Sequence, residues 1–303
     1  MGCLRMEHSQ NTSVPAETPL VEPGRTLGVI GAGVMGHTLI GGLLESGAIT
    51  REQVWAADIN AAACEKAAAA LGIPVEVSYQ HRVPGAGMIL VCVKPSQAAK
   101  VLVTLRGAGP RPDTLLISIM AGATTVQLEG MLGTANPWVR AMPNTPCIVR
   151  QGMSVICGGR HAKPEHLARA QRVFEAVGEC EAADEAYFNA ITALSGSGPA
   201  YQYLIMEALA DAGVRVGLPR QLALKLVAQT ALGAARMVQT SGRHPAALRD
   251  DVTTPAGCTI GGLLMLEDGK IRSVLARAVE EATRIAAQLA PPVAHDSGAA
   301  AHS

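Results

Sequence analysis

The sequence has no excess charge of either sign, because 25 lysines and arginines balance 25 aspartates and glutamates. It also lacks a long basic run, so it lacks the electrostatic footprint needed to bind nucleic acid or an acidic membrane surface. Its apolar stretches are strand-sized or interrupted by glycine and charge, and residues 1–24 contain no signal-peptide apolar core. We therefore expect a cytoplasmic protein that binds neither nucleic acid nor membrane.

The cysteine pattern excludes two further kinds of site. The seven cysteines form no C-x-x-C pair and show no metal-ligand spacing. An odd number of cysteines is consistent with reduced thiols in a cytosol. We predict no disulfide and no bound metal.

Length and composition favour two domains flanked by tails. The 303 residues are 49% hydrophobic, which is enough for two packed cores. Strand and helix patterns alternate over residues 25–184, which predicts an α/β domain with a doubly wound parallel sheet of the Rossmann type. The apolar period is helical over 185–290, which predicts an all-α domain. Residues 1–24 and 291–303 are polar or rich in small residues, and we expect disordered tails there.

A glycine-rich turn follows the first predicted strand, residues 26–30, and precedes a helix. This context makes the G-x-G-x-x-G pattern a dinucleotide-binding signature. The first glycine allows the tight turn, the second leaves room for a pyrophosphate, and the third lets helix and strand approach each other. The helix N-terminus then faces the phosphates. The predicted cofactor-binding residues of this turn are Gly31, Ala32, Gly33, Val34, Met35 and Gly36.

Asp58 and Asn60 follow the second predicted strand, about twenty residues beyond the glycines. A carboxylate at this position binds the adenosine ribose hydroxyls and favours NAD. Asn60 could instead hydrogen-bond a 2′-phosphate, and a third interpretation is that Asp58 only begins the turn into the helix at 61–71. The preference between NADH and NADPH stays open.

Three later predicted strands, 88–93, 114–120 and 138–142, end in small or polar turns. Ligands of doubly wound sheets bind outside the carboxyl ends of the strands, so these turns are candidates for a cofactor cleft. Lys94 can equally be an ordinary surface lysine, whereas Asn144 is better placed to offer an amide to a nicotinamide. The candidate cofactor-binding residues of the turns are Val93, Lys94, Pro95, Ala121, Gly122 and Asn144.

The helical half contains a candidate anion seat where the segment TTPAGCT, residues 253–259, opens a helix. Pro255, Ala256 and Gly257 leave the backbone N–H groups around Cys258 and Thr259 free at that helix start, and Thr259 can act as N-cap and as ligand donor. Ser195 lies in a glycine-rich turn that we interpret as a tight corner between helices, with a contribution to the substrate pocket. A hydrolase nucleophile is excluded there because a helix, and not a strand, precedes the serine.

The segments 219–240 and 271–289 are apolar over more than one helical face. A single neighbouring helix could not cover such a surface, so we predict a homodimer formed through the helical domain. The alternative is that both helices fill the core of a large monomeric domain.

These motifs resemble those of the pyrroline-5-carboxylate reductase family over residues 25–285. The resemblance implies NAD(P)H-dependent reduction of 1-pyrroline-5-carboxylate to L-proline, the last step of proline biosynthesis, usually with NADPH. It also implies dimers that often assemble into larger rings. The matching motifs are GxGxMG at 31–36, VKP at 93–95, AGAT at 121–124, RAMPNTP at 140–146, LSGSGPAY at 194–201, GLP at 217–219 and LRDDVTTPAGCT at 248–259.

The resemblance further implies that the glycine turn and the three strand-end turns line the cofactor, while Gly257, Cys258 and Thr259 receive the substrate. Four positions depart from the family pattern. They are Ala256 where glycine is usual, Asp251 where asparagine is frequent, Met120 where a small residue is common, and Asp58 where NADPH-preferring relatives often carry Ser, Thr, Asn or Arg.

The segment 250–266 contains no histidine, no lysine and no carboxylate beyond its first two residues. Imine chemistry explains this lack, because a cyclic imine nitrogen is basic enough to enter as iminium and needs no strong side-chain acid. Thr259 is then the candidate catalytic residue, as a hydrogen-bond partner of the ring nitrogen.

Two other functions compete with this interpretation. A β-hydroxyacid dehydrogenase would need a catalytic lysine on the first long interdomain helix, and residues 185–212 contain none. A non-catalytic dinucleotide sensor would not need the TTPAGCT seat.

Overall fold

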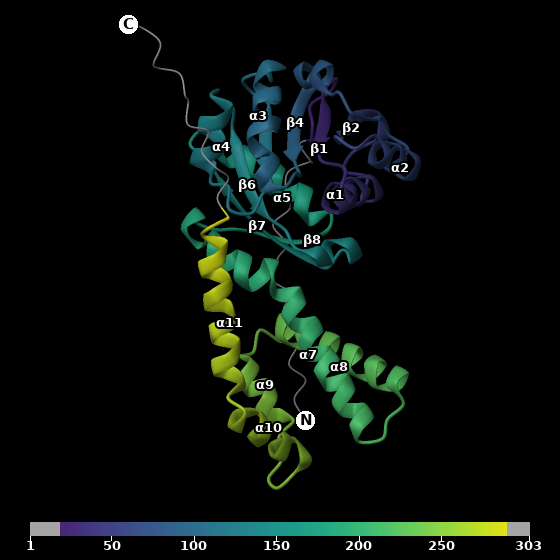
Figure 1. The fold of residues 1–303 in the computed structure, drawn as a ribbon, viewed down its shortest axis with the longest axis vertical. Coiled ribbons are helices and arrows are strands. Elements are labelled where there is room, and N and C mark those ends of the chain that lie inside the picture. Colours follow the sequence, from purple (N-terminus) through teal and green to yellow (C-terminus); the bar gives the residue numbers. More distant parts are fainter. Residues whose placement is uncertain (1–18, 290–303) are drawn as a thin grey trace, which may run out of the picture.

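The computed structural model describes residues 19–289 as an α/β part followed by an extended helical part. In Figure 1 the sheet and its covering helices lie at one end of the molecule, and the helices α7 to α11 extend away from it. The expected tail regions 1–18 and 291–303 lie outside the described residues.

An eight-stranded sheet with the order β3-β2-β1-β4-β5-β6-β7-β8 forms the α/β part. The strands are β1 Thr26–Ile30, β2 Val54–Ala57, β3 Val75–Glu76, β4 Ala86–Val91, β5 Leu115–Ser118, β6 Trp138–Met142, β7 Gly152–Gly158 and β8 Gly178–Ala182. All neighbouring strands pair in parallel except β6 and β7. The predicted fold class is therefore confirmed, with one antiparallel pair and the two-residue edge strand β3 as unpredicted features.

Helices cover both faces of this sheet, which explains why its strands are apolar runs. Along β4, Met88 and Leu90 join one core cluster and Ile89 and Val91 join the other. The helices of this part are α1 Val34–Glu45, α2 Ala61–Leu71, α3 Ala98–Gly107, α4 Thr125–Leu132 and α5 Pro164–Glu175. Residues of α1, α2 and α5 pack in the first cluster and residues of α3 and α4 in the second.

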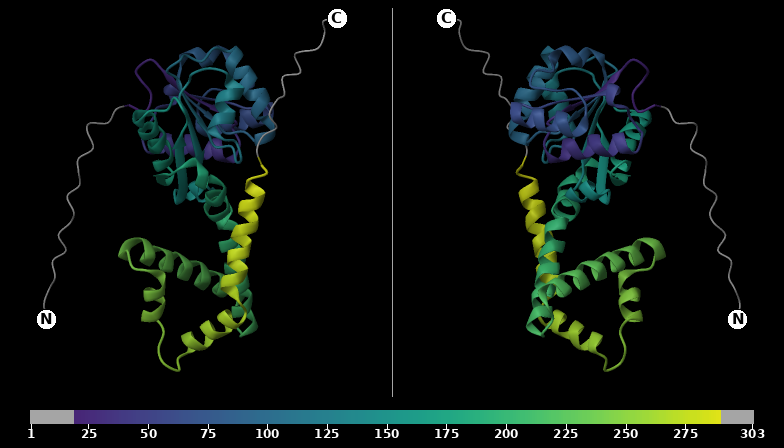
Figure 2. Two further views of the ribbon diagram at one scale, coloured as in Figure 1. Left: turned by 90° about the vertical axis from the view of Figure 1, so that its left-hand side faces the viewer. Right: turned by 90° about the vertical axis from the view of Figure 1, so that its right-hand side faces the viewer.

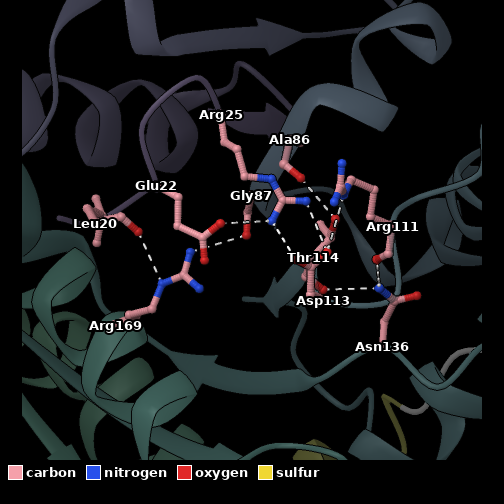
Figure 3. A network of polar contacts seen from close by, with 10 residues as sticks. All are labelled: Leu20, Glu22, Arg25, Ala86, Gly87, Arg111, Asp113, Thr114, Asn136 and Arg169. Atoms are coloured by element: carbon pink, nitrogen blue, oxygen red, sulfur yellow. Dashed lines mark hydrogen bonds and ion pairs between the residues drawn. The ribbon is translucent and has the colours of Figure 1, made fainter. Parts of the chain in front are cut away.

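The chain is ordered before the domain start predicted at residue 25. Leu20 and Val21 are buried in the core, and the Arg169 guanidinium donates to the carbonyls of Leu20 (3.1 Å) and Gly87 (3.2 Å). Figure 3 shows this anchor beside the ion pair of Arg25 and Asp113. The expectation of a disordered tail reaching residue 24 is therefore wrong for 19–24, because two apolar side chains in a polar segment are enough to dock it.

The helical part begins at η5 Glu185–Tyr187 and continues through α6 Phe188–Ile191 and the π-helical turn η6 Thr192–Gly196. In this turn Ser197 N donates to Thr192 O at 2.8 Å, and α7 starts directly after it. The tight corner predicted around Ser195 is therefore wrong, since the helix widens by one residue and continues. The later helices are α7 Gly198–Arg215, α8 Arg220–Ser241, α9 Pro245–Asp251, α10 Cys258–Asp268 and α11 Ile271–Ala286.

These later helices do not form a core of their own. Figure 2 shows α7 to α11 as an open arrangement, and full burial within them is limited to Ala210, Ala223 and Ala286. Large apolar side chains of α8 are left exposed, such as Leu224 (49% exposed) and Leu232 (54% exposed). An apolar surface of this extent is typical of an interface and not of a finished monomeric domain. Within the described residues, no helix combines the length and apolarity of a membrane span.

Candidate active site

The glycine turn has the geometry that a bound pyrophosphate requires. Gly31 adopts φ 105°, and a Cβ there would collide with the Cys92 carbonyl. A Cβ on Gly36 would collide with the Gly31 carbonyl, whereas one on Gly33 would meet nothing within 4 Å. The first and third glycines therefore serve the fold, and the second faces open space where a ligand can approach.

The N-terminus of α1 opens onto this space. Gly33 is its N-cap and provides no side-chain cap, and the first turn contains no acidic residue. The first N–H groups of the helix are therefore available to an anion, and the helix dipole favours negative charge there. Gly33 and Val34 are exposed, whereas Ala32, Met35 and Gly36 turn toward the protein interior.

A cavity of about 340 Å³ adjoins the turn at the carboxyl ends of β1, β2 and β4. Its walls are largely apolar, as an adenosine site requires. Burial raises the pKa of Tyr79, one of the lining residues, to about 12, so its phenol stays neutral. The lining residues are Ile30, Gly31, Ala57, Asp58, Ile59, Val77, Tyr79, Gln80, Val93, Gln97, Lys100, Val101 and Thr104.

Several of these lining residues were missed by the sequence reasoning. Gln97, Lys100, Val101 and Thr104 lie three or four residues apart, so they share one face of the α3 segment. That spacing is a signal in the sequence which could have identified this wall. Val77, Tyr79 and Gln80 lie between the end of β3 and the start of the 3₁₀ helix Gln80–Gly85, and an unpredicted two-residue strand could not have indicated them.

Asp58 lines the cavity and also holds the glycine turn. Its carboxylate accepts the N–H of Ala32 and the N–H of Asn60, each at 3.0 Å. Asn60 uses its amide oxygen to cap α2, accepting from Ala62 N at 3.0 Å and Ala63 N at 3.3 Å. Asp58 therefore stabilises the turn, and it also lines the cavity. Asn60 is not among the lining residues.

The turns after β4 and β5 lie at the same sheet edge. Val93 lines the cavity, Lys94 is exposed and precedes the short 3₁₀ helix that begins at Pro95. Ala121 and Gly122 follow β5, with Gly122 at φ 77° and Met120 buried beneath them. Lys94, Pro95, Ala121 and Gly122 do not line the cavity, so their expected cofactor contacts stay predictions for the nicotinamide side of the cleft.

Asn144 has both ends of its amide in use. Its nitrogen lies 3.2 Å from the Ser195 carbonyl and 3.4 Å from the Ser195 hydroxyl, and its oxygen accepts the N–H of Met153 at 2.9 Å. The amide expected to face a nicotinamide instead joins the α/β part to the π-helical turn in this chain. The same bonds place Ser195 at the joint between the two parts.

The second candidate seat is the start of α10. Gly257 is the N-cap and provides no side-chain cap, so the N–H groups of Cys258 and Thr259 are free. Thr259 is the second residue of the helix, and its predicted N-cap role is therefore wrong. Its hydroxyl makes no hydrogen bond within the described chain. Cys258 is exposed and Ala256 adopts φ 57°.

Asp251 is tied to its own helical part. Arg243 donates to its two carboxylate oxygens at 2.6 and 3.1 Å, and this hydrogen bonding lowers the pKa of Asp251. Within residues 19–289, no group of His, Cys, Asp and Glu side chains could hold a metal ion.

The two seats lie at opposite ends of one chain. In Figures 1 and 2, α10 lies at the far end of the helical part from the sheet that carries the glycine turn. The glycine turn and the start of α10 are therefore far apart within one chain.

Fold and site together define a Rossmann-type, dinucleotide-binding oxidoreductase that assembles through its helical part. A family model described as pyrroline-5-carboxylate reductase dimerisation matches residues 185–289, and one described as NADP oxidoreductase coenzyme F420-dependent matches residues 26–122. The chain is 40% identical over 271 residues to pyrroline-5-carboxylate reductase of Pisum sativum, covering 89% of this chain and 98% of the relative. The chain belongs to the pyrroline-5-carboxylate reductase family.

Solved structures agree with this assignment. A pyrroline-5-carboxylate reductase from Coxiella burnetii matches with a TM-score of 0.83 and 31% identity, covering 89% of this chain and all of that one. The Plasmodium falciparum pyrroline carboxylate reductase with NADP bound matches with a TM-score of 0.78 and 31% identity, covering 88% and 98%. The dimerisation model supports oligomerisation through the C-terminal region of this chain.

Proposed function

We propose that the protein reduces 1-pyrroline-5-carboxylate to L-proline with NAD(P)H, as the last step of proline biosynthesis in the cytoplasm. The chain belongs to this family, and the observation that supports the proposal most strongly is the uncapped start of α10. It offers free backbone N–H groups for a carboxylate and a free threonine hydroxyl for a ring nitrogen, with no acid or base beside them.

The α/β part fits a nicotinamide dinucleotide. The open space over Gly33 and the uncapped N-terminus of α1 suit a pyrophosphate, and the apolar cavity beside Asp58 suits an adenosine. When bound, the reduced nicotinamide supplies a hydride to the carbon of the C=N bond. Gly31, Gly33 and Asp58 hold the cofactor in place, with Lys94, Gly122 and their neighbours on the nicotinamide side.

The residues of the α10 seat bind and orient the substrate. The N–H groups of Cys258 and Thr259 hold its carboxylate at the positive end of the helix dipole. The Thr259 hydroxyl hydrogen-bonds the ring nitrogen, which is basic enough to arrive protonated. Orientation is then the main contribution of the protein, because the cyclic iminium needs no further acid to accept a hydride.

The assembly that completes the site is a homodimer in this proposal. The exposed apolar faces of α7 to α11 pack against those of a second copy, and the α10 seat of one chain lies over the cofactor cleft of its partner. Such dimers can assemble further into a ring. An obligate interface is consistent with the near absence of burial in these helices.

A spectrophotometric assay tests the proposed function. Oxidation of NADPH and of NADH is followed at fixed enzyme concentration with 1-pyrroline-5-carboxylate and without substrate. Reduction of NAD(P)⁺ by a 3-hydroxyacid is measured at the same enzyme concentration. We expect turnover only with the cyclic imine. Equal turnover of the hydroxyacid would favour the dehydrogenase alternative, and tight cofactor binding without any turnover would favour a sensor.

A further inference from the structure

The strand β6 contributes a large share of the joint between the α/β part and the helical part, beside β7 and the start of α4. Alternate residues of a strand face the same side of the sheet, so Arg140, Met142 and the following Asn144 point toward the helical part. Val139 and Ala141 point to the opposite side and join the core under α1 and α5. The helices α7 and α11 pack on α6 and η6, so segment 185–196 carries their connection to the sheet.

Glu185 is the first residue of the helical part and accepts three hydrogen bonds from two residues, Thr125 and Arg140. One carboxylate oxygen accepts the N–H of Thr125 at 2.8 Å and Nη1 of Arg140 at 3.1 Å. The other accepts the Thr125 hydroxyl at 2.7 Å. Thr125 is the first residue of α4, so the carboxylate also lies at the positive end of a helix dipole.

Arg140 binds a second residue of the helical part. Its guanidinium carbon lies 4.5 Å from the ring centroid of Phe188, one helical turn after Glu185. The Arg140 side chain is 4% exposed and Phe188 is buried, so the cation–π contact is shielded from water, whereas the Glu185 end of the ion pair is 27% exposed. Burial also raises the pKa of the neighbouring Cys157 to about 12.

Two further contacts complete the joint at η6. A Cβ on Gly196 would lie 2.7 Å from the terminal methyl group of Met142, so the backbone of η6 approaches this side chain closely. Asn144 binds Ser195 at the adjacent position. Contacts at 185, 188, 195 and 196 thus attach the first three turns of the helical part to β6, to the residues that follow it, and to the neighbouring elements α4 and β7.

We propose that Arg140, Glu185 and Asn144 are positioning residues for hydride transfer, which set the angle between the cofactor-binding part and the helical part. The proposal rests on the proposed reductase function and on a site shared between two chains. The helical part carries the dimer interface, so a change of angle at 185–196 moves the nicotinamide relative to the substrate on the partner's α10. A displacement of about 1 Å can lower a rate about a hundredfold.

The test compares Glu185→Gln, Arg140→Lys and the double variant Arg140→Met/Glu185→Gln in the full-length oligomer. The double variant removes both charges, so no unpaired charge stays buried and folding is protected. Asp113→Asn is the matched control. It removes one charge of the Arg25–Asp113 ion pair, which lies within the α/β part and away from the joint. Turnover, the NADPH dissociation constant, the oligomeric state and the isotope effect with cofactor deuterated at nicotinamide C4 are measured.

We expect kcat of the three joint variants to fall about tenfold or more, with NADPH affinity within about twofold of wild type and the oligomer intact. The isotope effect on kcat should rise, because hydride transfer becomes slower relative to the other steps, and a mere loss of folded protein would leave it unchanged. Asp113→Asn should keep wild-type kcat and isotope effect.

Wild-type kcat and isotope effect in folded joint variants would overturn the proposal. A fall in kcat that only follows loss of NADPH binding or of folded oligomer would overturn it as well. Failure of the proposed function is a different result, since the wild-type protein itself would then not oxidise NADPH with 1-pyrroline-5-carboxylate.

Discussion

At the scale of single residues, the two seats are defined more by groups that are absent than by groups that are present. Gly33 leaves the N-terminus of α1 open, and Gly257 does the same for α10. In both places backbone N–H groups are available to an anion, and Thr259 carries the only hydroxyl within α10 itself. A Cβ on Gly33 would meet nothing within 4 Å, so a substitution there separates binding from folding, whereas a Cβ on Gly257 would collide with the Thr254 hydroxyl.

Thr259→Ala should weaken use of the substrate by about 1–3 kcal/mol, because a hydrogen bond to the ring nitrogen is lost. Cofactor affinity and thermal stability should change little, since the hydroxyl caps nothing in the chain. Steady-state kinetics with both substrates measure this split. Thr240→Ala on α8 is the control, because its hydroxyl bonds only the Arg236 carbonyl. Equal kinetics of Thr259→Ala and wild type would remove Thr259 from the site.

Ala256→Gly should stabilise the fold by about 0.5–1 kcal/mol. Ala256 adopts φ 57°, and the left-handed conformation costs an L-residue with a Cβ more than it costs glycine. Ala69→Gly on the exposed face of α2 is the control and should destabilise by a similar amount, because helical backbone favours alanine. Urea unfolding midpoints measure both. A lower midpoint for Ala256→Gly would contradict the strain inferred there.

Asp58→Asn should shift cofactor preference toward NADPH. The variant keeps an acceptor oxygen for the Ala32 N–H and removes a charge that repels a 2′-phosphate, an effect of about 1–2 kcal/mol near the surface. The ratio of kcat/KM for NADPH and NADH measures the shift. An unchanged ratio would show that another part of the cavity, such as the wall that contains Lys100, distinguishes the 2′-hydroxyl from the 2′-phosphate.

At the scale of elements, local patterns predicted most of the fold. The apolar runs and caps located the major strands and helices, and the G-x-G-x-x-G turn lies between β1 and α1 as its spacing required. Pairing direction was not predictable from such runs. The connection between β6 and β7 is too short for a parallel crossover, so this pair is antiparallel.

The unpredicted parts of the site depend on contacts between distant segments. Asn144 bonds Ser195, 51 residues later, and Glu185 bonds Thr125, 60 residues earlier. No local pattern marks either pair. Leu20 and Val21 likewise pack in the core, although the polar composition of the segment around them does not predict this contact. Residues of α3 that line the cavity share a helical face, and their spacing could have been recognised.

At the scale of the whole molecule, the helical part has apolar surface without a core. Ala231→Glu places a charge on α8 at a half-buried position among exposed leucines, where a partner helix would desolvate it. We expect inactive monomer, measured by light scattering and activity at the same concentration. Gln229→Glu on the same helix is the charge control. A fully active monomer of Ala231→Glu would contradict the shared site.

In the proposed dimer one chain holds the cofactor while the other presents the imine, and complementation between two inactive variants tests this sharing. Gly33→Val blocks the pyrophosphate without a clash in the fold, and Thr259→Asp repels the substrate carboxylate while suiting a helix N-terminus. Each variant alone should not oxidise NADPH with 1-pyrroline-5-carboxylate. Co-expressed together, they should recover about a quarter of wild-type activity, because half the dimers are hybrid and each hybrid has one intact site. No recovery from a proven hybrid dimer would contradict the account.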